Sequence, residues 1–213
     1  MKLTIALLFL AGSLFAGDPV TLTLKDFTSA NGGGPGEGWA EKDGVIALTG
    51  KGAGILLSKD EYASFELEWD WKLAEGGNNG IKYWVTKVGG KEWLGIEYQM
   101  IDDKDGHDYG AKHSTASFYD VLPPTVPNAA KPAGEWNHSR VLVQGNHVEH
   151  WLNGKNVLEY ELGSEEVLKA VQKSKFKSVE GFGKNQNGHI LLTYHNGPVS
   201  YRNIKIRPLA GAK

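Results

Sequence analysis

Apolar and charged residues alternate without a break from Ser64 to Lys72. Successive side chains of a β-strand point to opposite faces, so this segment predicts a strand with one buried and one exposed face. The face expected in the core carries Phe65, Leu67, Trp69 and Trp71, and the opposite face carries Glu66, Glu68, Asp70 and Lys72.

Comparable short segments recur along the chain, and two Asn-containing turns, Gly145-Asn146 and Asn153-Gly154, separate three of them. Asn-Gly between alternating strands is the strongest short-range signal for a hairpin. One helix is expected over Ser164–Lys173, with a Ser cap and two Glu in its first turn. We therefore predict an all-β fold, a two-sheet antiparallel β-sandwich of the jelly-roll kind with one short helix. The other expected strands are Thr21–Leu24, Gly44–Leu48, Gly54–Ser58, Gly80–Thr86, Trp93–Ile101, Ser139–Val143, His147–Leu152, Lys155–Tyr160, Gly188–His195 and Val199–Arg207.

The first 16 residues have the pattern of an export signal. One positive charge at Lys2 precedes a short apolar run that ends in a small residue, Ala16. The run is too short to span a bilayer. Residues 1–16 are therefore predicted to be a signal peptide and residues 17–213 one domain, secreted or periplasmic in a bacterium. The chain has no Cys, which excludes thiol catalysis and Cys-based metal sites.

Charge and motifs exclude several classes of function. The chain carries 23 basic and 25 acidic residues without a basic block, which argues against nucleic-acid binding. It has no nucleophilic serine elbow, no phosphate loop and no helical zinc motif. No cofactor is expected. The run Asp102-Asp103-Lys104-Asp105 resembles the start of a calcium loop without its Gly and terminal Glu, so a structural Ca²⁺ stays open. We expect a carbohydrate partner and no membrane contact after signal cleavage, and the oligomeric state stays open.

The segment Trp93–Asp102 carries the most informative polar residues. Alternation places Leu94, Ile96, Tyr98 and Met100 in the core, and Trp93, Glu97 and Gln99 on the other face. Asp102 is an odd number of residues from Glu97, so on a regular strand it would face the core. A bulge near Met100-Ile101 would return it to the face of Glu97. The spacing E-x-Q-x-x-D echoes the E-x-D-x-x-E strand of one group of retaining β-glucanases. An ordinary exposed strand face is the simpler interpretation of this segment alone.

Histidines and aromatic residues supply further candidates. His107 and Tyr119 lie in a long irregular stretch, Asp102–Pro132, and long ordered loops in compact domains are usually functional. His189 and His195 bracket a predicted strand. A lone histidine is more often a hydrogen-bonded structural residue than a catalyst, and most of the seven Trp are expected in the core.

Six segments, in order, resemble the 3-keto-disaccharide hydrolase family. They are Gly77–Tyr83, Gly95–Asp103, Lys131–Asn137, Gly145–Gly154, Gly188–Leu192 and Tyr201–Ile206. The resemblance implies the concanavalin A-like lectin/glucanase fold and an exported bacterial enzyme that cleaves glycosides already oxidised at C3. Family members usually carry Leu-Gln-Asp-His-Gly where this chain has Leu192-Thr193-Tyr194-His195-Asn196.

The resemblance also implies roles for the candidates. A ketone at C3 acidifies the C2 proton, so a base can start an elimination that releases the group on C1. Glu97 or His107 could be the base. Gln99, Lys82 or His195 could stabilise the enolate, and Asp102 could orient His107 or protonate the leaving group. Expected sugar contacts are Asn79, Lys82, Trp93, Tyr119 and His189.

Two other functions stay open from the sequence. A non-catalytic, lectin-like carbohydrate-binding module would keep Trp93 and Gln99 but would not need Glu97. A direct retaining glycosidase would need the carboxylates of Glu97 and Asp102 about 5–5.5 Å apart.

The signal sequence gives the first testable prediction. The mature exported protein should begin at or near Gly17, because the small residue Ala16 completes a cleavage site. Mass spectrometry of protein recovered outside the cytoplasm measures the N-terminus. Mature protein that retains Met1 would contradict the prediction.

Overall fold

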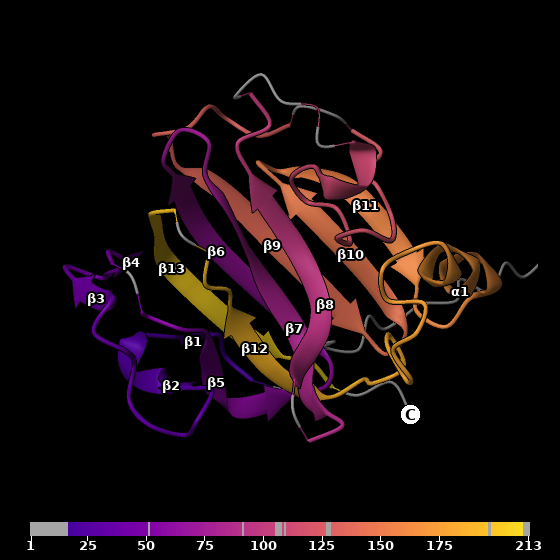
Figure 1. Ribbon diagram of the computed structural model, residues 1–213, viewed down its shortest axis with the longest axis horizontal. Helices are drawn as coiled ribbons and strands as arrows, with labels where there is room; N and C mark the ends of the chain where they lie inside the picture. Colours follow the sequence, from indigo (N-terminus) through magenta and orange to yellow (C-terminus); the bar gives the residue numbers. More distant parts are fainter. Residues whose placement is uncertain are drawn as a thin grey trace, which may run out of the picture.

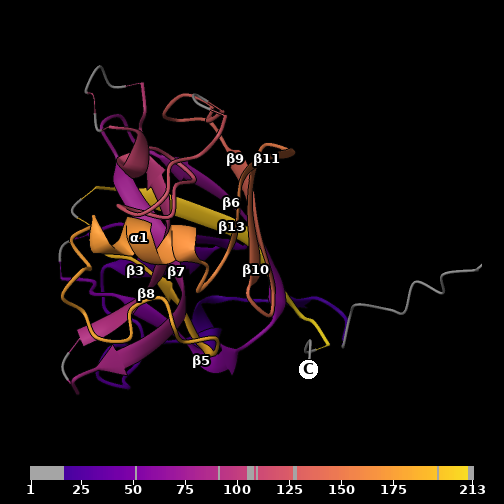
Figure 2. The same ribbon diagram turned by 90° about the vertical axis from the view of Figure 1, so that its right-hand side faces the viewer.

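Two antiparallel sheets packed face to face make up the protein (Figure 1, Figure 2). The computed structural model describes residues 17–50, 52–90, 92–104, 108, 110–126, 129–195 and 197–210. The predicted signal peptide and His107 lie outside the described residues. In the described part no helix is both long enough and apolar enough to cross a membrane.

The larger sheet has eight strands in the order β11-β10-β9-β6-β13-β4-β3, with β1 pairing on β13. Its strands are β1 Val20–Thr21, β3 Trp39–Lys42, β4 Val45–Leu48, β6 Phe65–Leu73, β9 Asn137–Gln144, β10 His147–Leu152, β11 Lys155–Glu161 and β13 Val199–Pro208. The smaller sheet has five strands in the order β2-β5-β12-β7-β8. These are β2 Phe27–Ser29, β5 Leu56–Tyr62, β7 Asn78–Val88, β8 Glu92–Ile101 and β12 Gly188–Leu192. The predicted two-sheet antiparallel sandwich is confirmed.

The expected helix is confirmed as α1, Glu165–Gln172, with Ser164 as its cap accepting a hydrogen bond from the Val167 amide. The expected strand Thr21–Leu24 is wrong in part. Only Val20–Thr21 pairs with β13, and a short 3-10 helix, Leu24–Asp26, follows. Its Asp26 carboxylate accepts hydrogen bonds from the amide and hydroxyl of Thr23, an interaction that favours a turn over an extended strand.

The core lies between the sheets, and the alternation of β6 supplies much of it. Trp69 is fully buried and Trp71 is 2 % exposed, as predicted. Several polar side chains in the core form hydrogen bonds between the two sheets. Tyr98 OH and Trp71 Nε1 both lie 2.8 Å from Ser139 Oγ. Buried polar atoms cost free energy unless they are paired, so these bonds fix how the two sheets meet.

A bulge that the sequence did not predict occurs in β7. Pairing with β8 shifts between Tyr83 and Thr86, and Trp84 has a φ of +52°. A Cβ on Gly95 would lie 2.6 Å from the Tyr83 carbonyl oxygen, and one on Gly188 would lie 2.6 Å from the Val85 oxygen. Glycines on both neighbouring strands therefore make room for the bulge, which turns Val85 to the outer face.

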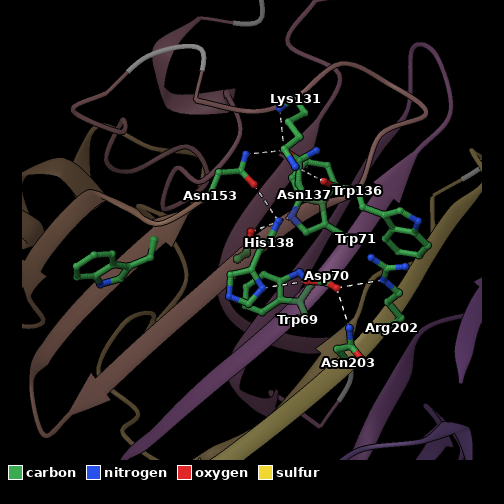
Figure 3. A network of polar contacts seen from close by, with 12 residues as sticks. Trp69, Asp70, Trp71, Lys131, Trp136, Asn137, His138, Asn153, Arg202 and Asn203 are labelled. Carbon is green, nitrogen blue, oxygen red and sulfur yellow. Dashed lines mark hydrogen bonds and ion pairs between the residues drawn. The ribbon is translucent and has the colours of Figure 1, made fainter.

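The outer face of the larger sheet carries a network of paired polar groups (Figure 3). The Asp70 carboxylate accepts hydrogen bonds from His138, Arg202 and Asn203 at 2.8 to 3.1 Å. The Arg202 guanidinium stacks 4.1 Å from the ring of Trp136. These contacts link β6, β9 and β13 side by side, and the cation covers the aromatic ring, so we interpret the network as structural.

A buried histidine gives a prediction about acid stability. His150 is fully buried, donates from Nδ1 to the Ala116 carbonyl and accepts from Tyr83 OH at Nε2. Burial lowers the pKa of His150 from 6.5 to about 4. As the pH falls from 6.5 to about 4, His150 is protonated in the unfolded chain but not in the folded protein. The free energy of unfolding therefore drops by up to about 3 kcal/mol over this range.

Denaturant unfolding at several pH values tests this. His150→Gln should be less stable at pH 7 because the bonds to Ala116 and Tyr83 are disturbed. Between pH 6.5 and 4 it should lose less free energy than the wild type, by about 1.4 kcal/mol per pH unit. Equal losses in the two proteins would contradict the assignment.

Candidate functional site

Glu97 on β8 faces away from the core and meets Lys82 on β7. The two residues are cross-strand partners, and Lys82 Nζ lies 3.3 Å from Glu97 Oε2. Glu97 is only 7 % exposed. Strand alternation therefore places a carboxylate and an ammonium group together on the outer face of the smaller sheet, as the sequence predicted for Glu97.

Gly80 provides the space that the Glu97 carboxylate occupies. A Cβ at Gly80 would lie 2.6 Å from Glu97 Oε1 and 3.0 Å from its Cγ. The side chain of Glu97 thus leans along the sheet over a backbone that has no side chain of its own. Any larger residue at this position would displace the carboxylate.

The loop after α1 adds Lys175, which sequence reasoning missed. Its Nζ lies 4.2 Å from the ring centre of Tyr119. Burial lowers the pKa of Lys175, Glu97 opposes this shift, and Lys82 lowers the pKa further, so the Lys175 ammonium group interacts electrostatically with both partners of the Lys82–Glu97 ion pair. The backbone amide of Lys175 donates to the Asp120 carboxylate at 2.6 Å, which fixes the loop beside Tyr119. No motif marks this lysine, because only the fold brings residues 119 and 175 together.

Tyr119 lies beside Glu97 because its segment runs along β8. The Tyr119 amide donates to the Glu97 carbonyl at 3.1 Å, and the Ala116 amide donates to the Gln99 carbonyl at 2.8 Å. Burial raises the pKa of the Tyr119 phenol, and Glu97 and Asp120 raise it further. The segment covers the free edge of β8, and it brings the predicted Tyr119 to the site.

His195 follows β12 and completes the group around Glu97. Burial lowers the pKa of His195, Glu97 opposes this shift, and Lys82 and Lys175 lower the pKa further. The imidazole is therefore neutral at neutral pH. The structure brings together four predicted residues, Glu97, Lys82, Tyr119 and His195, and we call these four with Lys175 the Glu97 cluster.

Gln99 is on the same face as Glu97 but is covered. It is 1 % exposed, and its Nε2 donates to Asn78 Oδ1 at 3.2 Å. Gln99 is therefore a buried neighbour of the cluster, held by its own hydrogen bond.

The predicted bulge at Met100-Ile101 is wrong. Pairing of β7 with β8 is regular there, with Asn79 opposite Met100 and Asn78 opposite Ile101. Asp102 follows the end of the strand, and its carboxylate accepts from the amides of Gly76 and Lys104. Five residues of extended chain separate Asp102 from Glu97, about 16 Å at 3.3 Å per residue. Asp102 therefore closes a turn, and the spacing contradicts a retaining pair of carboxylates.

Asn79 is wrong as a sugar contact, because it is fully buried. Its Oδ1 accepts from the Gly80 amide and from the hydroxyls of Thr193 and Tyr201, at 2.8 to 2.9 Å. The Thr193 amide also donates to the Gly80 carbonyl. Asn79 thus holds the backbone beneath Glu97 and ties it to the loop that carries His195.

Trp93 and His189 lie farther along the outer face. Trp93 is four residues from Glu97 on β8, about 13 Å, and its ring centre is 5.7 Å from that of His189. His189 Nδ1 donates to the Ser58 carbonyl at 2.8 Å. Both residues form a second patch with Leu57, Val85 and Leu191, separate from the Glu97 cluster.

The described residues include no group of three or more His, Cys, Asp or Glu side chains placed to hold a metal ion. Asp103, part of the calcium-like run, accepts the Thr115 amide with both carboxylate oxygens at 3.1 Å. The groups of the Glu97 cluster are a base, cations and a neutral imidazole, which suit proton transfer next to a developing oxyanion.

The space over Gly80 yields a prediction about the site. Gly80→Ala should displace the Glu97 carboxylate, and a displacement of about 1 Å can cost about 10²-fold in rate. The melting temperature should fall only modestly, because the shortest contact is with the end of the Glu97 side chain and the contact with the Tyr98 carbonyl oxygen would be 3.1 Å. Gly34→Ala, where a Cβ meets nothing within 4 Å, is the matched control. Turnover of Gly80→Ala equal to that of Gly34→Ala would contradict the proposed packing.

The chain is similar to several known proteins. A curated 3-keto-disaccharide hydrolase from Bacteroides thetaiotaomicron is 33 % identical over 204 residues, which cover 80 % of this chain and 70 % of the relative. A crystal structure described as a glycosyl hydrolase from Parabacteroides distasonis superposes with a TM-score of 0.79 at 30 % identity, covering 87 % of this chain and 89 % of the other.

A Bacillus subtilis protein described as having a galectin-like fold matches with a TM-score of 0.52 at 11 % identity, covering 89 % and 92 % of the two chains. This likeness concerns the fold alone. The profile of one family, described as the 3-keto-alpha-glucoside-1,2-lyase-like domain, matches residues 11–207. The chain belongs to this family.

Proposed function

We propose that the protein is a glycoside-cleaving enzyme that acts on 3-keto-glycosides, including 3-keto-disaccharides, by removing the C2 proton and eliminating the group on C1. The observation that carries this proposal is the nearly buried Glu97 carboxylate, which is paired with the Lys82 ammonium group. A glycosidase that works through two carboxylates would need a second acid within reach, and Asp102 is about 16 Å away along the strand.

Each group of the cluster has a role in such a reaction. Glu97 takes the proton from C2, and the electron pair of that C–H bond forms the enolate with its negative charge on the C3 oxygen. Lys82 stabilises this oxyanion, because its ammonium group already lies 3.3 Å from the carboxylate, and the positive charge of Lys175 adds to this effect. Tyr119 lies beneath Lys175 and limits its position.

Loss of the C1 substituent completes the elimination. The electron pair of the enolate forms the C1–C2 double bond as the bond between C1 and the glycosidic oxygen breaks. The departing oxygen takes up a proton from water. His195, neutral at neutral pH, donates a hydrogen bond from its N–H to the departing oxygen. Addition of water, with the hydroxyl on C1 and the proton on C2, gives net hydrolysis. The name of the curated relative supports this net reaction, and the family description supports the elimination.

A lectin-like module is the second candidate. The second patch, with the half-buried side chains of Trp93 and His189, favours it, since an aromatic side chain there can contact a sugar. A module that only binds would not need the ion pair of Glu97 with Lys82. Turnover therefore distinguishes the two functions directly.

Export is part of the proposal. Its support is the N-terminal sequence pattern with Ala16 before the expected cleavage point. The protein would then meet its sugar substrate outside the cytoplasm.

The role of Glu97 is tested by Glu97→Gln. Loss of a general base lowers the rate by about 10²–10⁴. The free energy of unfolding should change by no more than about 1 kcal/mol, because the amide has the same shape and Lys82 keeps a polar partner. Turnover of a 3-keto-disaccharide and a thermal melt are measured on the same preparation.

Glu92→Gln is the control for this experiment, because Glu92 lies exposed at the start of the same strand. It should keep wild-type turnover. Near-normal turnover of Glu97→Gln would remove Glu97 from the mechanism. A large fall in melting temperature would instead make Glu97 a structural residue.

A further inference from the structure

A hollow of ≈ 200 Å³ lies beside His195. It is lined by Leu48 and the turn after it, Thr49 and Gly50, and by Tyr194, His195, Gly197 and Pro198 from the loop between β12 and β13. We propose that this hollow binds the ring of the leaving sugar and that Tyr194 determines the preference for a disaccharide. The inference rests on the proposed function and extends it to the part of the substrate that departs.

The position of His195 connects the hollow to the Glu97 cluster. His195 lines the hollow, and its pKa responds to Glu97, Lys82 and Lys175. The ring that bears the ketone must lie at the carboxylate and the ammonium groups, because proton removal and enolate stabilisation occur there. The ring joined through the glycosidic oxygen then lies beyond His195.

Tyr194 is held in place before any ligand binds. Its hydroxyl accepts a hydrogen bond from the Gly52 amide at 2.9 Å, which ties the loop after β12 to the turn after β4. Its ring packs partly against the core. Such a fixed aromatic wall loses little freedom on binding, which favours affinity.

The chemistry of the lining fits a sugar ring. Leu48, Pro198 and the Tyr194 ring offer apolar surface, and Thr49 and His195 offer polar groups. Gly50 and Gly197 contribute backbone to the lining. The hollow is large enough for several water molecules, and we take its occupant to be one sugar ring.

The residue before Tyr194 has a different task. The hydroxyl of Thr193 donates a hydrogen bond to Asn79 Oδ1 beneath Gly80. Thr193 is therefore not one of the residues that line the hollow. Tyr194 alone of the two presents its side chain there.

The test uses two substrates that differ only in the leaving group, 3-keto-trehalose and the 3-keto form of methyl α-glucoside. Wild-type protein should have the higher kcat/KM for the disaccharide. Tyr194→Ala should lower kcat/KM for the disaccharide by about tenfold or more, mainly through KM, and leave the methyl glycoside within about twofold. Tyr194→Phe keeps the ring and should keep most of the preference.

Trp93→Ala is the comparison variant, because Trp93 borders the other patch on the same face. If the leaving ring lies over Trp93, Trp93→Ala loses the preference and Tyr194→Ala does not, which overturns the inference. An equal loss for both substrates in Tyr194→Ala also overturns it, since Tyr194 would then only support the fold. Wild-type protein that cleaves neither substrate overturns the proposed function and the subsite with it. Cleavage of both, with an unchanged ratio in Tyr194→Ala, overturns the subsite alone.

Discussion

The antiparallel register of β7 and β8 is the constraint on which the site depends. It sets Lys82 opposite Glu97 and Gly80 opposite Gln99. The Glu97 carboxylate therefore lies next to the Lys82 ammonium group and in the space that Gly80 leaves without a side chain. A shift of one residue would send Glu97 into the core and expose Tyr98. The buried bonds of Tyr98 and Asn79 across the sandwich oppose such a shift.

The same register explains how distant segments reach the carboxylate. The free edge of β8 receives the segment that carries Tyr119, and the loop after α1 is fixed there by the bond from Lys175 to Asp120. On the other side, Thr193 joins Gly80 and Asn79, which places His195. A base, two cations and a neutral imidazole therefore meet over one short stretch of sheet, and each depends on backbone bonds for its position.

The sequence predicted most of the fold, because alternation in β6 and β8 and the turn at Asn153-Gly154 are local signals. It also predicted Glu97, Lys82, Tyr119 and His195. The wrong predictions concern residues whose environment depends on contacts with distant parts of the sequence. The actual bulge at Trp84 depends on Gly95 and Gly188 of neighbouring strands, and Asn79 became buried because Tyr201 and Thr193 reach it. Lys175 could not be found, since only the packing of its loop against Tyr119 identifies it.

Hydrogen exchange at C2 of the sugar tests the central claim most directly. The protein is incubated with a 3-keto-disaccharide in D₂O, and the released 3-keto sugar is examined by NMR and mass spectrometry. If Glu97 removes the C2 proton and water adds later, the product carries deuterium at C2, and Glu97→Gln forms little product. Rapid cleavage by the wild type that leaves the C2 hydrogen in place would contradict the elimination and the role of Glu97 as its base.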